Sequence, residues 1–231
     1  MLGIIGAMEE EVVKIKAEME NPAVEEIAGM RFYKGTIGGK ETVVVQSGIG
    51  KVNAAICSQI LIDRFGVSAL VNTGIAGSLM NAINIGDVVL STDAVHHDMD
   101  ATIFGCKPGH VPRLDTLGFP ADQKLVELAG ECCRRVNPGI GVFTGRVLTG
   151  DQFIADNDKK AWMIETFNGA CVEMEGAAIA QTAYRNGVPF LIIREISDKA
   201  DGSAQMDYSE FEKNAIECSV RLVLELISKY E

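Results

Sequence analysis

Basic residues are scarce in this sequence. Its 231 residues include 21 Lys and Arg against 32 Asp and Glu, so the formal net charge is −11 at pH 7. No stretch of the chain collects Lys and Arg into a basic stripe, and the composition therefore disfavours binding to nucleic acid or to an anionic membrane. An acidic surface also fits a highly phosphorylated substrate poorly, unless a local pocket differs from it.

Long apolar runs and paired cysteine motifs are absent as well. No run approaches the roughly 18 residues that a membrane span needs, and the N-terminal MLGIIGAMEEE is too short and lacks the basic flank of a signal peptide. The cysteines are scattered without a CxxC pair, which predicts reduced, mostly buried thiols in a cytoplasmic protein and no zinc site. These cysteines are Cys57, Cys106, Cys132, Cys133, Cys171 and Cys218.

The sequence has no internal repeat, low-complexity tract or linker, so we expect a single domain over residues 1–231. Segments typical of strands and helices alternate along it, which predicts an α/β domain, a three-layer sandwich around a central β-sheet. Two adjacent strands early in the chain indicate that the sheet is mixed. The expected strands are Leu2–Gly6, Met30–Gly38, Glu41–Ser47, Ala69–Val71, Gly86–His96, Gly139–Thr149, the residues before Glu175, and Pro189–Ile196. The expected helices are Glu9–Glu20, Lys51–Phe65, Ala121–Val136, Asp158–Phe167, one ending at Gly187, and Tyr208–Tyr230.

Polar clusters follow four of these strands. They are Glu9–Glu11, the glycine-rich Asn72–Ser78, which we expect to be a turn, Glu173–Glu175 and Arg194–Asp198. Ligands of open α/β sheets bind at the carboxyl ends of strands. The coincidence of the four clusters therefore predicts a polar binding site at that edge of the sheet.

The segment Cys171–Ala180, CVEMEGAAIA, is the most informative of these junctions. It is typical of a strand that passes into a helix. If Glu173 and Glu175 are both extended, they point to the same side, where two like charges need partners or a ligand. A ribose, with its paired hydroxyl donors, would suit at least one of them. A structural ion pair or a solvated loop explains the pattern about equally well, and helix-start acids explain Glu9–Glu11 in the same way.

Other polar features carry weaker signals. Gly3-x-x-Gly6 is not GxGxxG, so a dinucleotide cofactor is not expected. His96, His97, Asp98 and Asp100 lack the spacing of a helical metal site, and we expect no metal ion there. Residues 101–120 form a long irregular segment of a kind that is usually functional, interfacial or mobile. Residues 199–207 are a polar stretch and a candidate lid.

Six motifs together resemble a known family. GIIGAMEEE, SGIGKVNAA, NTGIAGS, TGDQFI, VEMEGAAIA and REISD occur in this order from Gly3 to Asp198. This set resembles the 5′-methylthioadenosine/S-adenosylhomocysteine nucleosidases, a hydrolase branch of the purine nucleoside phosphorylase-like fold. VEMEGAAIA is shared with the wider superfamily, whereas GAMEEE with SGIGKVNAA and ISD is more specific to the nucleosidases.

The resemblance implies a role for each matching residue. Glu11 is expected to be the general base that activates water, and Asp198 the general acid that protonates purine N7. Glu175 is expected to bind the ribose hydroxyls, with the Met174 segment beneath the sugar. Ser197 is expected to position Asp198, and Phe153 to stack on adenine with the Ile154 backbone at the base edge. Glu173 and Arg194 are expected to complete the ribose-side polar network. The 5′-alkylthio pocket is expected to be lined by Met8, Ile49 and Tyr208, and Phe104 and Pro112 are expected to reach into the pocket of a homodimer partner.

One residue departs from the family pattern. Many relatives have serine where this chain has Ile75, so a hydrogen bond from that side chain is absent here. We expect an adjusted network around Glu11 rather than lost activity.

Three other activities are compatible with parts of the pattern. A phosphorylase would hold phosphate with arginines from glycine-rich loops, but GAMEEE and NTGIAGS contain none, which favours water as nucleophile. An aminofutalosine nucleosidase would share the base and ribose machinery and differ only in the 5′ pocket. A binding module without catalysis would be expected to lack Glu11, Glu175 or Asp198, and all three are present.

Overall fold

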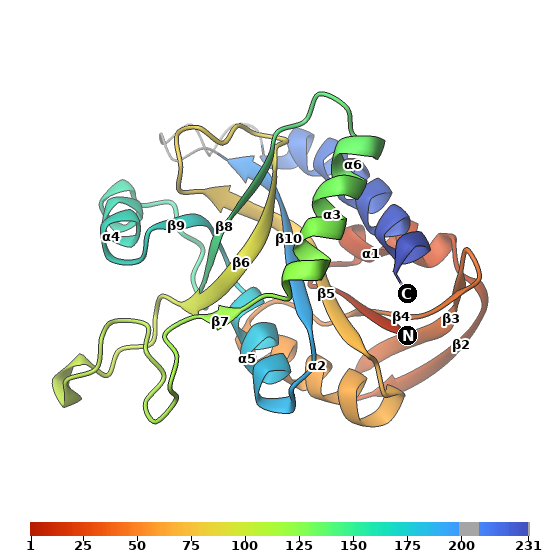
Figure 1. Cartoon of the computed structure of the whole chain (residues 1–231), viewed down its shortest axis with the longest axis horizontal. Helices are drawn as coiled ribbons and strands as arrows, with labels where there is room; N and C mark the ends of the chain where they lie inside the picture. Colours follow the sequence, from red (N-terminus) through yellow and green to blue (C-terminus); the bar gives the residue numbers. More distant parts are fainter. Residues whose placement is uncertain (199–207, 231) are drawn as a thin grey trace.

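A computed structural model describes residues 1–198 and 208–230, and within 208–216 it describes the course of a helix but not the side chains. Its centre is a ten-stranded mixed sheet (Figure 1). The strands are β1 (Leu2–Gly6), β2 (Glu20–Ile27), β3 (Met30–Ile37), β4 (Lys40–Gln46), β5 (Ala69–Ser78), β6 (Val88–His96), β7 (Phe119–Pro120), β8 (Val142–Thr149), β9 (Gly169–Glu173) and β10 (Phe190–Asp198).

The sheet closes on itself around β5. β5 pairs in parallel with β1 on one side and with β10 on the other, while its last residues, Gly77 and Ser78, pair antiparallel with β9. From β10 the order continues through β6 and β8 to β9, so five strands form a barrel-like ring from which β1, β4, β3 and β2 extend. β5 therefore brings the carboxyl ends of β1, β9 and β10 to one place.

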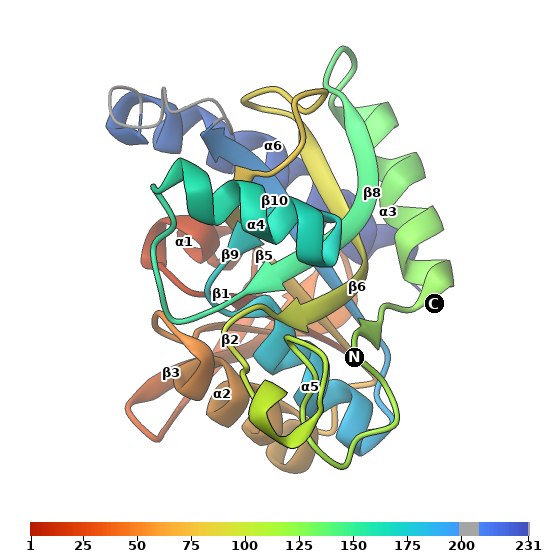
Figure 2. The same cartoon turned by 90° about the vertical axis from the view of Figure 1, so that its left-hand side faces the viewer.

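Helices cover both faces, which gives the predicted three layers (Figure 2). The helices α2 (Lys51–Phe65) and α5 (Gly176–Asn186) pack on one face around Cys57, Leu61 and Ile179. On the other face lie α1 (Glu9–Ala17), α3 (Gln123–Val136) and α6 (Tyr208–Lys229). The helix α4 (Asn157–Phe167) packs beside β9 through Met163 and Phe167. Among the described residues no helix is both long and apolar enough to cross a bilayer.

Most predicted elements are confirmed, and α2 has the predicted bounds. The prediction that Asn72–Ser78 forms a turn is wrong, because β5 runs through to Ser78. Its glycines serve close packing instead. A Cβ on Gly74 would lie 2.7 Å from Glu11 Oε1, and one on Gly77 would lie 3.0 Å from Asp198 Oδ2. The glycines make room for two carboxylates on the neighbouring elements.

β2 was not expected from the sequence. Pro22 lies within it, and proline is typical of a loop. In the structure Asn21 also has a positive φ of 48°. β2 is an exposed edge strand that pairs only with β3, and an edge is where a sheet tolerates proline.

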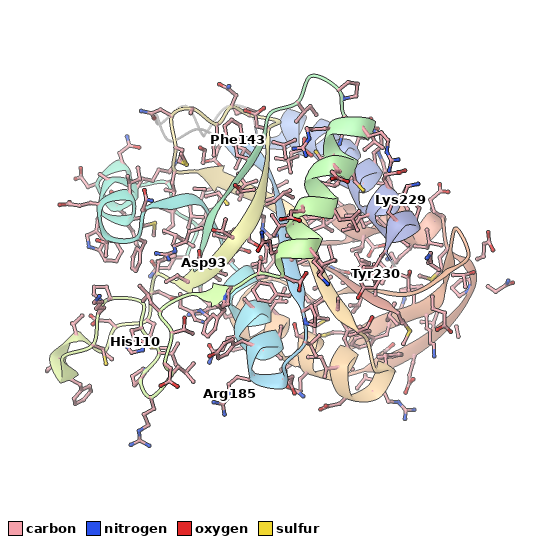
Figure 3. The ribbon with its side chains drawn as sticks, in the orientation of Figure 1. Asp93, His110, Phe143, Arg185, Lys229 and Tyr230 are labelled. Carbon is pink, nitrogen blue, oxygen red and sulfur yellow. The ribbon has the colours of Figure 1, made fainter. Side chains whose placement is uncertain are left out.

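The segment between β6 and β7 extends away from the sheet (Figure 1). It contains the short 3₁₀ helix η1 (Thr102–Phe104), and His110 marks its course in Figure 3. Ile103 and Phe104 on this helix are exposed. The expected lid at 199–207 lies outside the described residues.

Candidate active site

A cavity of about 180 Å³ lies where β1, β5, β9 and β10 end. Nine residues expected at a binding site line it, from five separate stretches of the chain. The lining residues are Ala7, Met8, Glu11, Ile49, Ile75, Ala76, Gly77, Phe153, Val172, Glu173, Met174, Glu175, Ser197 and Asp198. The structure therefore places a cavity at the predicted edge of the sheet, with four carboxylates around it.

Glu11 lies in the first turn of α1, and its carboxylate points back into the β1–α1 connection. Its Oε2 accepts hydrogen bonds from the backbone N–H groups of Ala7, at 2.6 Å, and Met8, at 3.0 Å. Burial raises the pKa of Glu11, and the Arg194 charge and the backbone donors oppose that rise. The side chain caps the helix and also presents a carboxylate to the cavity, so the structural role of Glu11 is compatible with the catalytic role that the resemblance implies.

Glu173, which lines the cavity, forms a buried ion pair with Arg194. The Arg194 guanidinium also donates to Asn72 Oδ1 and to the carbonyl of Ile193. Burial opposes the charge of Arg194, but the carboxylates of Glu173, Glu175 and Glu11 outweigh it and raise the pKa of Arg194. Arg194 does not line the cavity.

The Glu173 carboxylate is fully engaged within the protein. It accepts from Thr149 Oγ1 and from the backbone N–H groups of Glu175, at 3.1 Å, and Gly176, at 2.8 Å. Together with Arg194 these donors hold the β9–α5 junction in one conformation. Glu173 and Arg194 thus shape the site through contacts within the protein, and Arg194 Nε is left as a buried donor without a partner.

Glu175 differs from Glu173 although it lies two residues away. It is the N-cap residue of α5, and its Oε1 accepts one hydrogen bond, from the backbone N–H of Gly50 at 2.8 Å. Gly50 has a φ of 96°, which favours glycine there. Burial and the neighbouring Glu173 charge raise the pKa of Glu175 to about 7. Its remaining lone pairs can accept hydroxyl donors from a ligand in the cavity.

Asp198 is the last residue of β10 and lines the cavity. Ser197 Oγ donates to Asp198 Oδ1 at 3.1 Å, as expected for a positioning residue. Lys160 Nζ, from α4, lies 3.3 Å from Asp198 Oδ2, and its side chain is only 2% exposed. Sequence patterns do not single out Lys160, because a lysine in a short polar helix is typical of a solvated face.

The outer end of the cavity is aromatic and apolar. Phe153 lines it and is largely exposed, while Ile154 is buried in an adjoining cavity of about 40 Å³ that also touches Asp198 and Met174. Phe153 and Asp198 line both cavities, so an aromatic face and a carboxyl group are available to the same ligand. This arrangement suits a purine base.

Besides Arg194 and Ile154, three more predicted site residues are not seen at this cavity. Phe104 and Pro112 are exposed on the segment between β6 and β7 and do not line it. The side chain of Tyr208 lies outside the described residues. Met8 and Ile49 line the cavity as expected.

The histidine pair is buried and separate from the cavity. His96 Nε2 lies 2.9 Å from Gln181 Oε1, and burial lowers the pKa of His96. Burial also lowers the pKa of His97 to about 4. Asp98 does not pair with His97; it accepts from Lys51 Nζ at 2.7 Å. Both imidazoles are therefore neutral at pH 7, and no group of three His, Cys, Asp or Glu side chains in the described part of the chain is arranged to hold a metal ion.

Glu195 is a buried carboxyl group on the side of β10 that faces α6. It is 1% exposed, and Ser219 Oγ donates to its Oε2 at 3.2 Å. Burial raises the pKa of Glu195 to about 8, although Ser219 and Arg221 oppose the rise. Because the unfolded chain releases this proton near pH 4.5 and the folded chain keeps it, stability falls as the pH rises from 4.5 to 8.

We expect Glu195→Gln to remove this pH dependence. The unfolding free energy of the variant minus that of the parent should increase by about 3 kcal/mol from pH 5 to pH 7.5, because only the parent loses stability through Glu195. Urea unfolding at the two pH values measures it. Glu217→Gln is the control, because hydrogen bonding to Lys14 lowers the pKa of that exposed carboxyl and its effect has the opposite sign. If the difference in unfolding free energy between Glu195→Gln and the parent is the same at both pH values, Glu195 ionises normally.

Known proteins are similar to this chain over almost its full length. A family model described as the phosphorylase superfamily matches residues 1–228. A 5′-methylthioadenosine/S-adenosylhomocysteine nucleosidase of Exiguobacterium is 43% identical over 231 residues, covering 100% of this chain and 98% of the relative. The nucleosidase of Neisseria meningitidis, solved in complex with methylthio-immucillin-A, is 38% identical with a TM-score of 0.94, and 99% of each chain is covered.

The chain belongs to the 5′-methylthioadenosine/S-adenosylhomocysteine nucleosidase family. Its fold is the purine nucleoside phosphorylase-like α/β fold that the sequence motifs predict. A protein with a different name has the same fold. The futalosine hydrolase of Helicobacter pylori is 30% identical to this chain with a TM-score of 0.93, covering 99% of this chain and 97% of that one.

Proposed function

We propose that this protein hydrolyses the N-glycosidic bond of 5′-methylthioadenosine and S-adenosylhomocysteine, releasing adenine and the 5-substituted ribose. 5′-Deoxyadenosine, which retains the base and the ribose hydroxyls, should also be a substrate. Membership of the nucleosidase family supports this activity. The observation that carries it is the charge of the cavity. Four carboxylates line it, and none of its described lining residues is Lys or Arg.

This charge distribution favours water over phosphate as the nucleophile. A phosphorylase needs cations around the phosphate oxygens. Here Arg194 is engaged with Glu173 and Asn72, and Lys160 lies against Asp198. Cleavage of the glycosidic bond builds positive charge on the sugar, as in other oxocarbenium-like reactions, and nearby carboxylates stabilise that charge.

The positions of the side chains support a division of labour. Glu11, with its pKa raised by burial, is the proposed base that removes a proton from water. Asp198, which lines the cavity together with Phe153, is the proposed acid that protonates N7 and makes adenine a better leaving group. Glu175 is proposed to accept the ribose hydroxyls, and Met174 to pack beneath the sugar.

A product assay tests the proposed reaction. Purified protein is incubated with methylthioadenosine, with and without phosphate, and the sugar product is identified by mass. We expect adenine and free methylthioribose at a rate indifferent to phosphate. Methylthioribose 1-phosphate would refute hydrolysis, and tight binding without adenine release would indicate a nucleoside-binding module.

Aminofutalosine is a second candidate substrate because of the likeness to the Helicobacter pylori futalosine hydrolase. It would use the same base and ribose contacts and differ at the 5′ end, near Met8 and Ile49. Including it in the product assay separates the two candidates. Release of adenine from aminofutalosine at the higher kcat/KM would favour this alternative.

We also propose that the protein is a homodimer in which Phe104 and Pro112 complete the partner's 5′ pocket. Val52, Ile103 and Phe104 are exposed apolar residues, with Phe104 84% exposed. A groove of about 490 Å³ between α2 and α5 gives this face a concave surface. Sedimentation equilibrium should give twice the chain mass, and Phe104→Ala should raise KM for methylthioadenosine. A monomeric, fully active protein would contradict the proposal.

A further inference from the structure

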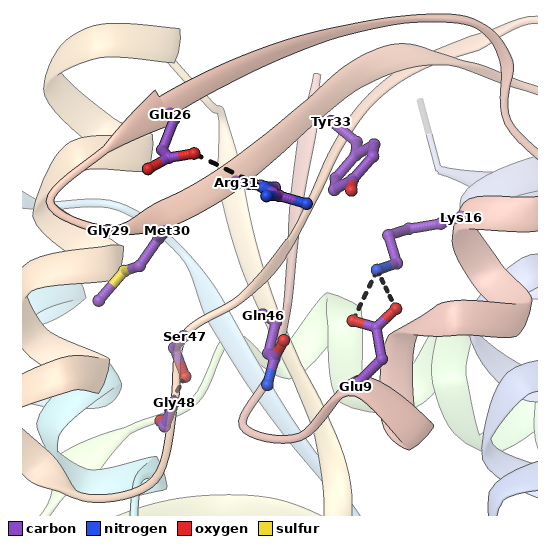
Figure 4. Close-up of a pocket in the computed structure, with 10 residues that line it drawn as sticks. All are labelled: Glu9, Lys16, Glu26, Gly29, Met30, Arg31, Tyr33, Gln46, Ser47 and Gly48. Carbon is purple, nitrogen blue, oxygen red and sulfur yellow. Dashed lines mark hydrogen bonds and ion pairs between the residues drawn. The ribbon is translucent and has the colours of Figure 1, made fainter.

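A second cavity, of about 450 Å³, is lined by ten residues that are not part of the candidate site (Figure 4). It lies between α1, the β2–β3 hairpin and the end of β4. Its described lining is mostly polar, with two charged pairs, Glu9 with Lys16 and Arg31 with Glu26, and the ring of Tyr33 between them. The proposed catalytic roles use none of these side chains.

The two cavities share the same pair of loops. The β1–α1 and β4–α2 connections are joined by a hydrogen bond from the Gly48 N–H to the Ala7 carbonyl at 3.1 Å. Met8 and Ile49 line the candidate active site, and the adjacent residues Glu9 and Gly48 line the second cavity. Since these residues are neighbours along the chain, the second cavity is a candidate for the end of a long substituent that extends past Met8 and Ile49.

The charged side chains of this cavity differ in the length of their ion pairs and in their exposure. Lys16 Nζ lies 2.6 Å from Glu9 Oε1 and 4.8 Å from the centroid of Tyr33, and its side chain is 12% exposed. Both Glu9 oxygens accept from Lys16 Nζ, at 2.6 and 2.7 Å, but the side chain is about half exposed, so the remaining lone pairs on its solvent side can accept from a second cation. Arg31 lies 3.6 Å from Glu26 and is 69% exposed. A surface pair of this kind is weak, so the guanidinium is available to a carboxylate that can engage it through two hydrogen bonds.

We propose that this second cavity binds the amino acid end of the 5′ substituent of S-adenosylhomocysteine, with Arg31 on its carboxylate and Glu9 on its ammonium group. The inference rests on the proposed function and deepens it. The methyl group of methylthioadenosine ends in the 5′ pocket and does not reach these charges. The cavity is therefore a specificity site for the longer, zwitterionic substrate.

Substitution of Arg31 tests this with two substrates. In Arg31→Ala we expect KM for S-adenosylhomocysteine to rise about tenfold, the value of one charge-assisted hydrogen bond, with kcat unchanged. KM for methylthioadenosine should stay the same. A 5′-butylthioadenosine probe, which has an uncharged tail, should also be unaffected, because the lost contact is with a charge. Glu9→Gln should act in the same direction on S-adenosylhomocysteine.

Arg64→Ala is the matched control. Arg64 is also an exposed arginine in a surface pair, 3.0 Å from Glu25, but it lies at the end of α2 and does not line the cavity. Its substitution should leave all three substrates unchanged. An unaltered KM for S-adenosylhomocysteine in Arg31→Ala, or an equal change for all three substrates, would overturn the inference while leaving the proposed hydrolysis intact. Absence of adenine from every substrate with the parent protein would refute the proposed function itself.

Discussion

Asparagine at position 198 should lower kcat for methylthioadenosine hydrolysis by at least about 100-fold, since acid assistance is worth on the order of 10²–10⁴ in rate. The amide can still accept the hydrogen bond that Ser197 Oγ gives to Asp198 Oδ1. It has no acidic proton to give to N7, so adenine must leave as an anion. Steady-state kinetics of Asp198→Asn, with circular dichroism to establish folding, measures the effect.

The control for this variant is Asp158→Asn, which removes an exposed carboxylate from the first turn of α4. It changes the net charge equally and should leave kcat unchanged. Because Lys160 Nζ lies 3.3 Å from Asp198 Oδ2, some loss of stability is expected in Asp198→Asn. Near-normal turnover by the folded variant would show that Asp198 is not the acid.

Glutamine at position 11 should cause a loss of similar size, about 10²–10⁴ in kcat, because an amide cannot take a proton from water. The amide oxygen can still accept from the Ala7 and Met8 N–H groups, so the cap on α1 is retained. In the parent protein kcat/KM should fall on the acid side at a pH above the usual value for glutamate, since burial raises the pKa of Glu11. That acid limb should be absent from the residual activity of Glu11→Gln.

Glu10→Gln provides the comparison. Glu10 lies in the same helical turn but is exposed, so its loss changes the helix dipole interaction by only a few tenths of a kcal/mol. It should retain full activity and an unchanged pH profile. If the two variants lose activity equally, the effect of Glu11→Gln comes from the helix terminus rather than from proton transfer.

The sequence predicted the layers and the place of the site because both depend on local patterns. Buried strands such as Phe190–Asp198 are apolar along most of their length, and polar residues follow where strands end. The error at Asn72–Ser78 has the same origin, since glycine is typical of turns. The reason for Gly74 and Gly77 is contact with Glu11 and Asp198, which no local pattern contains.

The different contacts of Glu173 and Glu175 show a second limit of prediction from sequence. Alternation placed both carboxylates at one site, and the choice between an ion pair and a ligand contact was open. Glu173 has the ion pair, with Arg194, and Glu175 has free acceptor capacity. Which carboxylate meets the arginine depends on the register of β9 against its neighbours, so sequence spacing alone could not decide it. Lys160 was missed for a related reason, because its burial depends on how α4 packs beside β9.

The hydrogen bonds that hold the site join distant parts of the chain. Ile5 accepts from Asn72, Asn72 accepts from Arg194, and Gly50 donates to Glu175. Such contacts have high sequence separation, and forming them requires closure of long loops late in folding. During synthesis the chain cannot assemble this site until β10 has emerged from the ribosome, so partially made protein has no nucleoside-binding capacity. Conversely, a ligand that occupies the site links the first strand to the last and stabilises the whole fold by mass action rather than one segment of it.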